Sequence, residues 1–592
     1  MRSLALLLIL CGLAACRSVD IDPQVAQTYV VATQSGRVVP SVSQGVLTYR
    51  DIPYAQAPVS ALRWKAPRPY SKPNAVIPAQ AISDTRDTVA CVQQAYDAGG
   101  VPGEGIVGTE DCLYMDIKAQ VGSMGATKPV MVWIHGGGNT SGYKGFYNFD
   151  ELVRREDVIV VTFNYRLGPL GWFAHPSIQV EGDELSGAAN FGHLDIIEAL
   201  KWVKTNIGGF GGDPDNVTIF GESAGGHNVF AMLASPLANG LFHKAISQSG
   251  YVKSATPEQA FNRDNADPTM RRTSWQLLQQ LDVDPLASAD TLRGLNAHAL
   301  YEAYYELDGE GDVPLTVADG VVIPELGFMA ALGDARYAKN VPVIAGANRD
   351  EVTLWLGTHR YFVEASYPFT KLLPPRLKVK DPAVYQDWIR VRSAAWKVRG
   401  VDQPLARMES AGYTDLYAYR FDWDDQETSF FADFPAIIGA AHGIDIAFLT
   451  GAFTYGPVSP WVYPDSAERQ EMMELMMGAW AEFARSARPK TPVAWPEYSA
   501  EERAFIHLDV KDALRTAKDT DTVDSLLARI EGFDHMSQQE RCLLGWETLT
   551  KVGQPDYERF ERWSYCQNFD AVAFQLDVKN ALIEQYGTTS VL

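Results

Sequence analysis

The sequence predicts an α/β fold in which a central, mostly parallel sheet is flanked by helices. Short apolar runs rich in Val and Ile recur between turn residues, which is typical of strands buried on both faces. Segments with helical periodicity lie between several of these runs, and such alternation favours a parallel sheet. The 592 residues, of which 46% are hydrophobic, contain no repeat, low-complexity block or Ser/Gly-rich linker, so we expect one large domain.

The predicted elements follow in chain order. Strands are expected at residues 28–33, 45–49, 129–134, 157–163, 217–220, 341–345 and 416–420. Residues 195–207 are expected to form a helix because their apolar side chains recur with a period of about 3.6 residues. A second helix is expected at 224–233, directly after the strand at 217–220.

The first residues resemble an export signal. Arg2 is followed by an apolar run from Leu4 to Ala15, and a run of about 7–15 residues is typical of a secretory signal and too short to span a bilayer. The run ends in L-A-A-C at residues 13–16, which resembles the bacterial lipoprotein signal, where the chain is cut before a Cys that is then acylated. We therefore expect export and lipidation at Cys16, with Arg17 favouring the outer membrane. The alternative is an ordinary secreted protein.

The charge balance is acidic, because 51 Lys and Arg residues against 73 Asp and Glu residues give a net charge of −22. A field of this sign repels phosphate backbones, so we expect no nucleic-acid partner. Apart from the lipid anchor, we expect no membrane contact. The sequence leaves the oligomeric state undetermined.

Two of the 6 cysteines belong to the export signal: Cys11 would leave with it and Cys16 would carry lipid. The four that remain are Cys91, Cys112, Cys542 and Cys566. In an oxidising compartment an even number favours disulfides; three pairings are open, and pairing of sequence neighbours is the simplest. The alternative is four buried thiols. None of the four has the spacing of zinc ligands, so we expect no zinc site.

The motif G-E-S-A-G at residues 221–225 lies directly after a predicted strand and before a predicted helix. In that setting Ser223 would sit on a sharp turn that lifts its hydroxyl above the sheet, and the helix N-terminus would favour developing negative charge. Upstream, H-G-G-G at residues 135–138 also follows a strand, and its glycines allow backbone N–H groups to surround one carbonyl oxygen. The alternatives are an ordinary strand-to-helix turn and a flexible glycine loop.

Further motifs accompany these two: I-P-Y-A at 52–55, E-D-C-L-Y at 110–114, N-Y-R-L-G at 164–168 and F-G-G-D-P at 210–214. Together they resemble the type-B carboxylesterases of the cholinesterase-like family, over residues 34–547. This resemblance implies the α/β-hydrolase fold and hydrolysis of carboxylic esters through an acyl-enzyme, with no cofactor and with a small-molecule ester as substrate.

The resemblance also implies the site residues. Ser223 would be the nucleophile, and His442, in G-A-A-H-G at 439–443, would be the base. Glu351, in G-A-N-R-D-E at 346–351, would be the acid that orients this His, with Asp350 as the alternative. The oxyanion donors would be the backbone N–H groups of Gly137, Gly138 and Ala224. Ser249 matches a serine that supports the acid, and Cys91–Cys112 matches the first disulfide of the family; Cys566 would then pair with Cys542.

Departures from the family limit what carries over. Asn139 replaces an aromatic residue after the glycines, so we expect a more polar pocket wall, and Val352 replaces a glycine after the acid. The loop between the first two disulfide cysteines contains no Trp, and a choline ester would need such a ring for a cation–π contact. We therefore do not expect choline esters as substrates.

The expected organisation is a signal at 1–15, a tether at 16–33, a carboxylesterase domain at 34–553 and a C-terminal extension at 554–592 that packs on the body. Two alternative functions remain open. One is a surface-binding member of the same fold that does no catalysis. The other is amide cleavage or another acyl transfer with the same triad.

Overall fold

An eleven-stranded sheet organises the computed structural model, which describes residues 28–79, 89–96, 100–179, 185, 187–307, 311–368 and 375–591. The signal and the expected lipidation site Cys16 lie outside the described residues. In spatial order the strands are β18 (Arg515–Lys518), β17 (Ala504–Leu508), β16 (Leu416–Phe421), β13 (Val343–Asn348), β12 (Lys244–Gln248), β11 (Gly212–Glu222), β9 (Lys128–Ile134), β10 (Ile159–Phe163), β8 (Tyr114–Gln120), β4 (Val46–Pro53) and β3 (Ser41–Ser43).

The pairings from β17 to β10 are all parallel, and those at both edges are antiparallel. The sheet is therefore parallel at its centre and mixed overall. The parallel strands end at one edge, where the loops after β9, β11 and β13 meet.

Helices cover both faces of the sheet. Successive side chains of a strand point to opposite faces, and in β9 Val130 and Val132 pack with α5 (Phe191–Asn206) and α6 (Ala224–Ala234). Met131 and Trp133 point the other way, toward α2 (Asp150–Glu156), α16 (Ile446–Thr450) and α18 (Ala467–Ser486). This two-sided burial explains why the central strands are continuous apolar runs.

Five strands of the sheet were not predicted from the sequence: β3, β8, β12, β17 and β18. In β8 the charged side chains of Asp116 and Lys118 are buried inside the sheet, where they form ion pairs with Lys144 and Asp150. A paired charge can be buried, but the partners lie about thirty residues away, beyond the reach of a local hydrophobic pattern.

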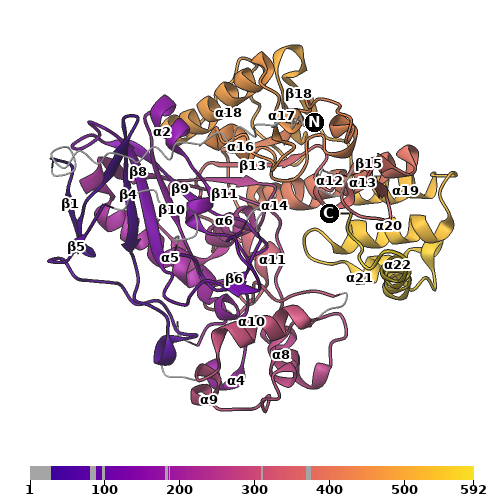
Figure 1. Cartoon of the computed structure of the whole chain (residues 1–592), viewed down its shortest axis with the longest axis horizontal. Helices are drawn as coiled ribbons and strands as arrows, with labels where there is room; N and C mark the ends of the chain where they lie inside the picture. The colour runs from indigo at the N-terminus through magenta and orange to yellow at the C-terminus, as the bar shows by residue number, and fades with distance from the viewer. Residues whose placement is uncertain are drawn as a thin grey trace, which may run out of the picture.

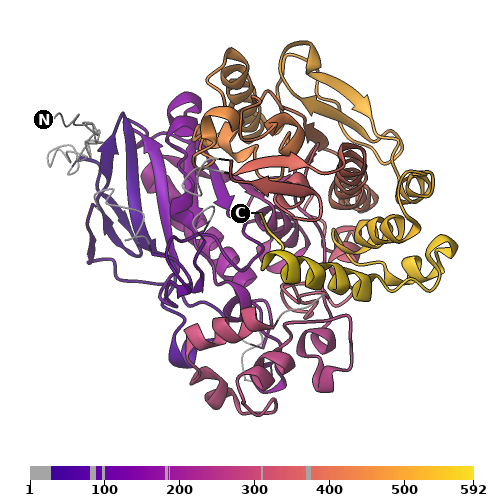
Figure 2. The ribbon, with the colours of Figure 1, turned by 45° about the vertical axis from the view of Figure 1, so that its right-hand side comes forward.

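The C-terminal part of the chain packs together on one side of the molecule (Figures 1 and 2). Its core joins α13 (Pro382–Lys397), α19 (Val523–Glu531), α20 (Gln538–Thr550), α21 (Tyr557–Arg562) and the start of α22 (Ala571–Tyr586). The disulfide Cys542–Cys566 ties α20 to the extension, and Cys91–Cys112 closes the other predicted loop. The extension then returns to the body, where the Val591 amide donates to the Thr358 carbonyl at 2.9 Å.

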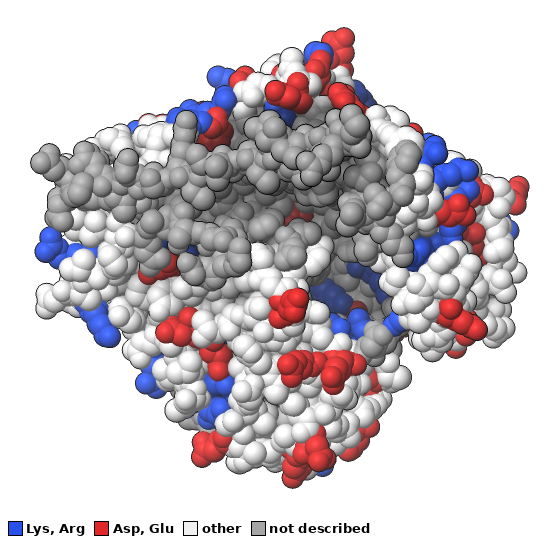
Figure 3. Space-filling model, viewed as in Figure 1, with Lys and Arg blue, Asp and Glu red and all other residues white. Residues whose placement is uncertain are grey.

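The surface is mixed in charge. On the face shown in Figure 3, acidic and basic side chains are interspersed, and Lys and Arg side chains also lie in a hollow beside the C-terminal helices. Within the described residues, no helix combines the length and the apolar character that crossing a bilayer requires.

Candidate active site

Ser223 occupies a strained turn between β11 and α6. Its φ of +59° lies in the left-handed region that non-glycine residues rarely adopt. A Cβ atom on Gly225 would lie 2.0 Å from the Ile134 carbonyl oxygen, and one on Gly221 would lie 2.5 Å from it. The turn therefore requires both glycines of the motif, because β9 passes directly behind it.

The glycine loop after β9 faces the same space. Gly137 and Gly138 are exposed and have φ values of +97° and +63°, and both line the cavity that Ser223 and His442 line. Ala224 is the first residue of α6, where backbone N–H groups have no partner within the helix. In the described part of the chain, none of these three N–H groups donates to a protein acceptor.

Glu351 contacts His442 directly. Its Oε2 atom lies 2.5 Å from His442 Nδ1, and its Oε1 atom accepts a hydrogen bond from the Asn348 amide at 2.8 Å. Asp350 turns away and accepts a hydrogen bond from the Ala440 amide at 3.0 Å. Of the two carboxylates that the sequence left open, the structure brings Glu351 to the imidazole.

The departure at Val352 causes no strain, because this residue has a φ of −80° that any side chain tolerates. No direct hydrogen bond joins Ser249 to Glu351 among the described residues, so a supporting role for Ser249 stays a prediction. Its hydroxyl is buried and has no hydrogen-bond partner among the described residues, while its carbonyl accepts a hydrogen bond from Trp396 Nε1 at 3.2 Å.

Sequence reasoning assigned no role to Glu222, although it is the acidic residue inside the nucleophile motif. Its Oε1 atom lies 3.2 Å from His442 Nε2, whereas no hydrogen bond among the described residues joins the Ser223 hydroxyl to His442. Burial raises the pKa of Glu222 to about 8, against the lowering effect of His442. Burial alone would lower the pKa of His442, but Glu222 and Glu351 outweigh it and raise that pKa to about 9.

The cavity over Ser223 has a volume of about 760 Å³ and is rich in aromatic side chains. Trp355 and Trp396 stack with ring centroids 5.8 Å apart, and both lie within 5.1 Å of the His442 ring. Tyr96, the aromatic residue of the first disulfide loop, also lines the cavity. These rings are contributed by segments distant in sequence, so local patterns could not reveal them.

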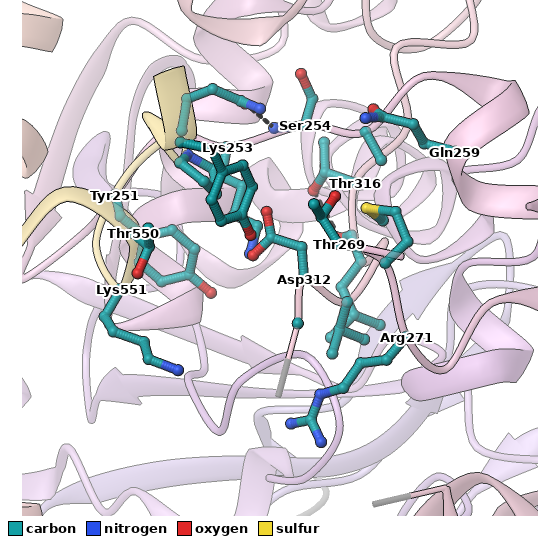
Figure 4. A pocket seen from close by; sticks show the side chains of 18 of the residues that line it. Tyr251, Lys253, Ser254, Gln259, Thr269, Arg271, Asp312, Thr316, Thr550 and Lys551 are labelled. Carbon is teal, nitrogen blue, oxygen red and sulfur yellow. Dashed lines mark hydrogen bonds and ion pairs between the residues drawn. The ribbon is translucent and has the colours of Figure 1, made fainter. Parts of the chain in front are cut away.

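A side pocket of about 540 Å³ adjoins this cavity and shares Tyr251, Lys253 and Lys551 with it. Figure 4 shows its two walls: Lys551 comes from the C-terminal part of the chain, and Thr316 lies opposite. Lys253 forms an ion pair with Asp312 between them.

The expectation of a more polar wall at Asn139 is wrong. Asn139 is only 1% exposed and does not line the cavity. Its side chain points behind the glycine loop, where it meets Asn228 of α6. The replacement of an aromatic residue by Asn139 therefore affects how the glycine loop is supported and leaves the surface that faces a substrate unchanged.

A serine on a strand–turn–helix elbow, a carboxylate-bound histidine and a glycine loop at one edge of the sheet define a serine hydrolase of the α/β-hydrolase fold. The carboxylesterase family model matches residues 24–367 and 398–525, and the chain belongs to this family.

Named relatives agree with this assignment. The para-nitrobenzyl esterase of Bacillus subtilis is 32% identical over 498 residues, covering 81% of this chain and 94% of its own. Human carboxylesterase 3 is 29% identical over 555 residues, covering 84% and 90%. A crystal structure of a Geobacillus stearothermophilus carboxylesterase superimposes with a TM-score of 0.65 at 28% identity, covering 84% of this chain and 99% of that one. The chain is thus a carboxylic ester hydrolase.

Proposed function

We propose that Ser223, His442 and Glu351 are the catalytic triad, and that the N–H groups of Gly137, Gly138 and Ala224 form the oxyanion hole. The observation that carries the proposal is the 2.5 Å contact between Glu351 and His442 Nδ1. This contact occupies Nδ1, so Nε2 is the nitrogen that remains to accept the serine proton in the cavity that His442 and Ser223 both line. A serine hydroxyl needs such a base because it is a weak nucleophile at neutral pH.

The reaction follows from this arrangement. Ser223 Oγ attacks the ester carbonyl while His442 Nε2 takes its proton, and the carbonyl oxygen becomes an oxyanion against the three N–H groups. His442 then protonates the leaving alcohol, and an acyl-enzyme remains on Ser223. Water, deprotonated by His442, attacks the acyl carbonyl, and Ser223 recovers its proton as the acid leaves. Glu351 holds the imidazole in the required tautomer and stabilises its cation.

The aromatic lining and the volume of about 760 Å³ suit an ester with an aromatic or medium-length apolar group. A relative is named for para-nitrobenzyl esters, and we propose aryl and benzyl esters as the first substrates to examine. The adjoining side pocket offers further room for a longer acyl or alcohol group.

We also propose export and lipid anchoring at Cys16 to the bacterial cell envelope. The support is the sequence L-A-A-C at residues 13–16, after an apolar run. Growth with a palmitate analogue should label the wild-type chain and leave C16A unlabelled. Equal labelling of the two would contradict the proposal.

Hydrolysis of a series of p-nitrophenyl esters tests the triad. S223A should lose on the order of a millionfold in turnover, and an organophosphate should add mass to Ser223 in the wild type. A labelled serine without ester turnover would favour amide cleavage or another acyl transfer, which matched amide substrates would detect. A wild type without turnover or labelling would favour a binding protein.

A further inference from the structure

A buried pair of amides joins the two elements that carry the proposed oxyanion donors. Asn139 follows Gly138 in the glycine loop, and Asn228 lies on α6 one helical turn after Ala224. Asn228 Nδ2 donates to Asn139 Oδ1 at 2.9 Å, and Asn139 Nδ2 donates to Asn228 Oδ1 at 3.3 Å. The two side chains therefore bridge loop and helix in both directions.

The backbone at residue 139 suits this residue type. Asn139 has a φ of +59°, and among non-glycine residues Asn tolerates the left-handed region best. Its own carbonyl accepts a hydrogen bond from the Gly168 amide at 2.7 Å. An aromatic residue here would lose the bridge and would adopt this conformation at a higher cost.

Neighbouring side chains hold both amides in place. The Tyr165 hydroxyl lies 3.3 Å from Asn139 Oδ1 and 2.7 Å from the carbonyl oxygen of His135, at the start of the glycine loop. His193 Nε2 lies 3.0 Å from Asn228 Oδ1. Burial lowers the pKa of His193 to about 4, so the ring is neutral and Nε2 carries the proton that it donates to this oxygen.

The glycine loop needs such support. Gly137, Gly138 and Asn139 have consecutive positive φ values, and glycines restrict the backbone least. Stabilisation of an oxyanion depends on donors held about 2.7–3.1 Å from the developing charge. The loop supplies two proposed donors and α6 supplies the third, so the spacing between loop and helix determines whether all three reach one oxygen.

We propose that the Asn139–Asn228 pair sets the spacing between the glycine loop and α6 and thereby aligns the oxyanion hole. Both are positioning residues, because neither lines the cavity. The proposal rests on the oxyanion hole assigned above.

The test uses N139G, which keeps the left-handed backbone accessible, N228A, which removes the partner without a backbone constraint, and the double variant. The rate of hydrolysis of a p-nitrophenyl ester is divided by the concentration of active sites, which is measured by titration with an organophosphate until labelling is complete. Each single variant should lower kcat by about 10- to 100-fold, since full loss of one donor costs about 10²–10³, with little change in KM. Affinity for a trifluoromethyl ketone, which mimics the tetrahedral intermediate, should fall by the same factor as kcat/KM.

The double variant should be no slower than the slower single variant, because both changes remove the same bridge. N262G is the matched control. Asn262 is also buried, has a φ of +50° and bonds through its side chain to the backbone of Asp267, and neither residue lines the cavity. It should lower the melting temperature and leave kcat per titrated site unchanged.

Wild-type kcat and ketone affinity in N228A would overturn the proposal, even if N139G does not fold. Multiplicative losses in the double variant would also overturn it, because the two residues would then act independently. Absence of ester turnover in the wild type would instead remove the proposed function itself.

Discussion

Replacing Glu222 by Gln should shift the pH dependence of catalysis. The substitution preserves size and removes the carboxylate that lies 3.2 Å from His442 Nε2. Catalysis needs neutral His442, so activity should rise with pH through the pKa of this group, which is raised to about 9. Without the carboxylate of Glu222, the imidazolium is less stabilised, its pKa falls, and the acid limb of the kcat/KM profile moves to lower pH.

Coulomb's law bounds the size of the shift. Unit charges 3.2 Å apart attract by about 1.3 kcal/mol at the dielectric constant of water and by about 5 kcal/mol at an effective value of 20. At about 1.36 kcal/mol for each pKa unit, this corresponds to roughly one to four units. Burial raises the pKa of Glu222 itself to about 8, so its carboxyl is only partly charged over the pH range in which His442 titrates. We therefore expect the pKa of His442 to fall by about one to two units in E222Q.

The assay is kcat/KM for a p-nitrophenyl ester from pH 5 to 10. The plateau above the limb should also fall, because Glu222 no longer stabilises the imidazolium that forms when His442 accepts the serine proton. E198Q is the matched control: burial raises the pKa of Glu198 to about 7, but this carboxyl lies on α5 and does not line the cavity. An acid limb that stays in place in E222Q, or moves as far in E198Q, would refute the reasoning.

Three further changes test the site and the fold. E351Q should lower kcat by about 10⁴-fold, as loss of the orienting acid does in other triads, whereas D350N should change kcat less than about tenfold; similar losses in both would contradict the assignment of the acid. G225A should destabilise the protein by more than about 4 kcal/mol, because its Cβ would lie 2.0 Å from a backbone oxygen. G478A is the comparison, because a Cβ at this position would meet open space, and it should raise the free energy of unfolding by as much as about 1 kcal/mol. Urea unfolding measures both variants, and equal stability of G225A and G478A would exclude the steric argument. C566S should lower the free energy of unfolding by about 3 kcal/mol, because the disulfide spans 24 residues, and thermal unfolding unchanged from the wild type would count against this.

Local patterns identified the elements that lie closest to the chemistry. The G-E-S-A-G motif predicted the turn at Ser223, since the strand, the tight turn and the helix are all encoded within residues 217–233. The apolar runs of β9, β10 and β13 predicted their burial, because a strand covered on both faces has no polar side to interrupt it. In contrast, β8 was missed because its buried charges depend on partners elsewhere in the chain.

The sequence by itself determined the fold class, the nucleophile elbow and, through its motifs, the family. Only the tertiary structure decided that Glu351 and not Asp350 meets His442, that Glu222 faces the same imidazole, and that Asn139 turns inward to Asn228. Periodicity and turn chemistry act between residues that are near neighbours in the chain, so they can be read locally. These three contacts join positions 89 or more residues apart, and they exist only once the parallel strands bring their ends to one edge.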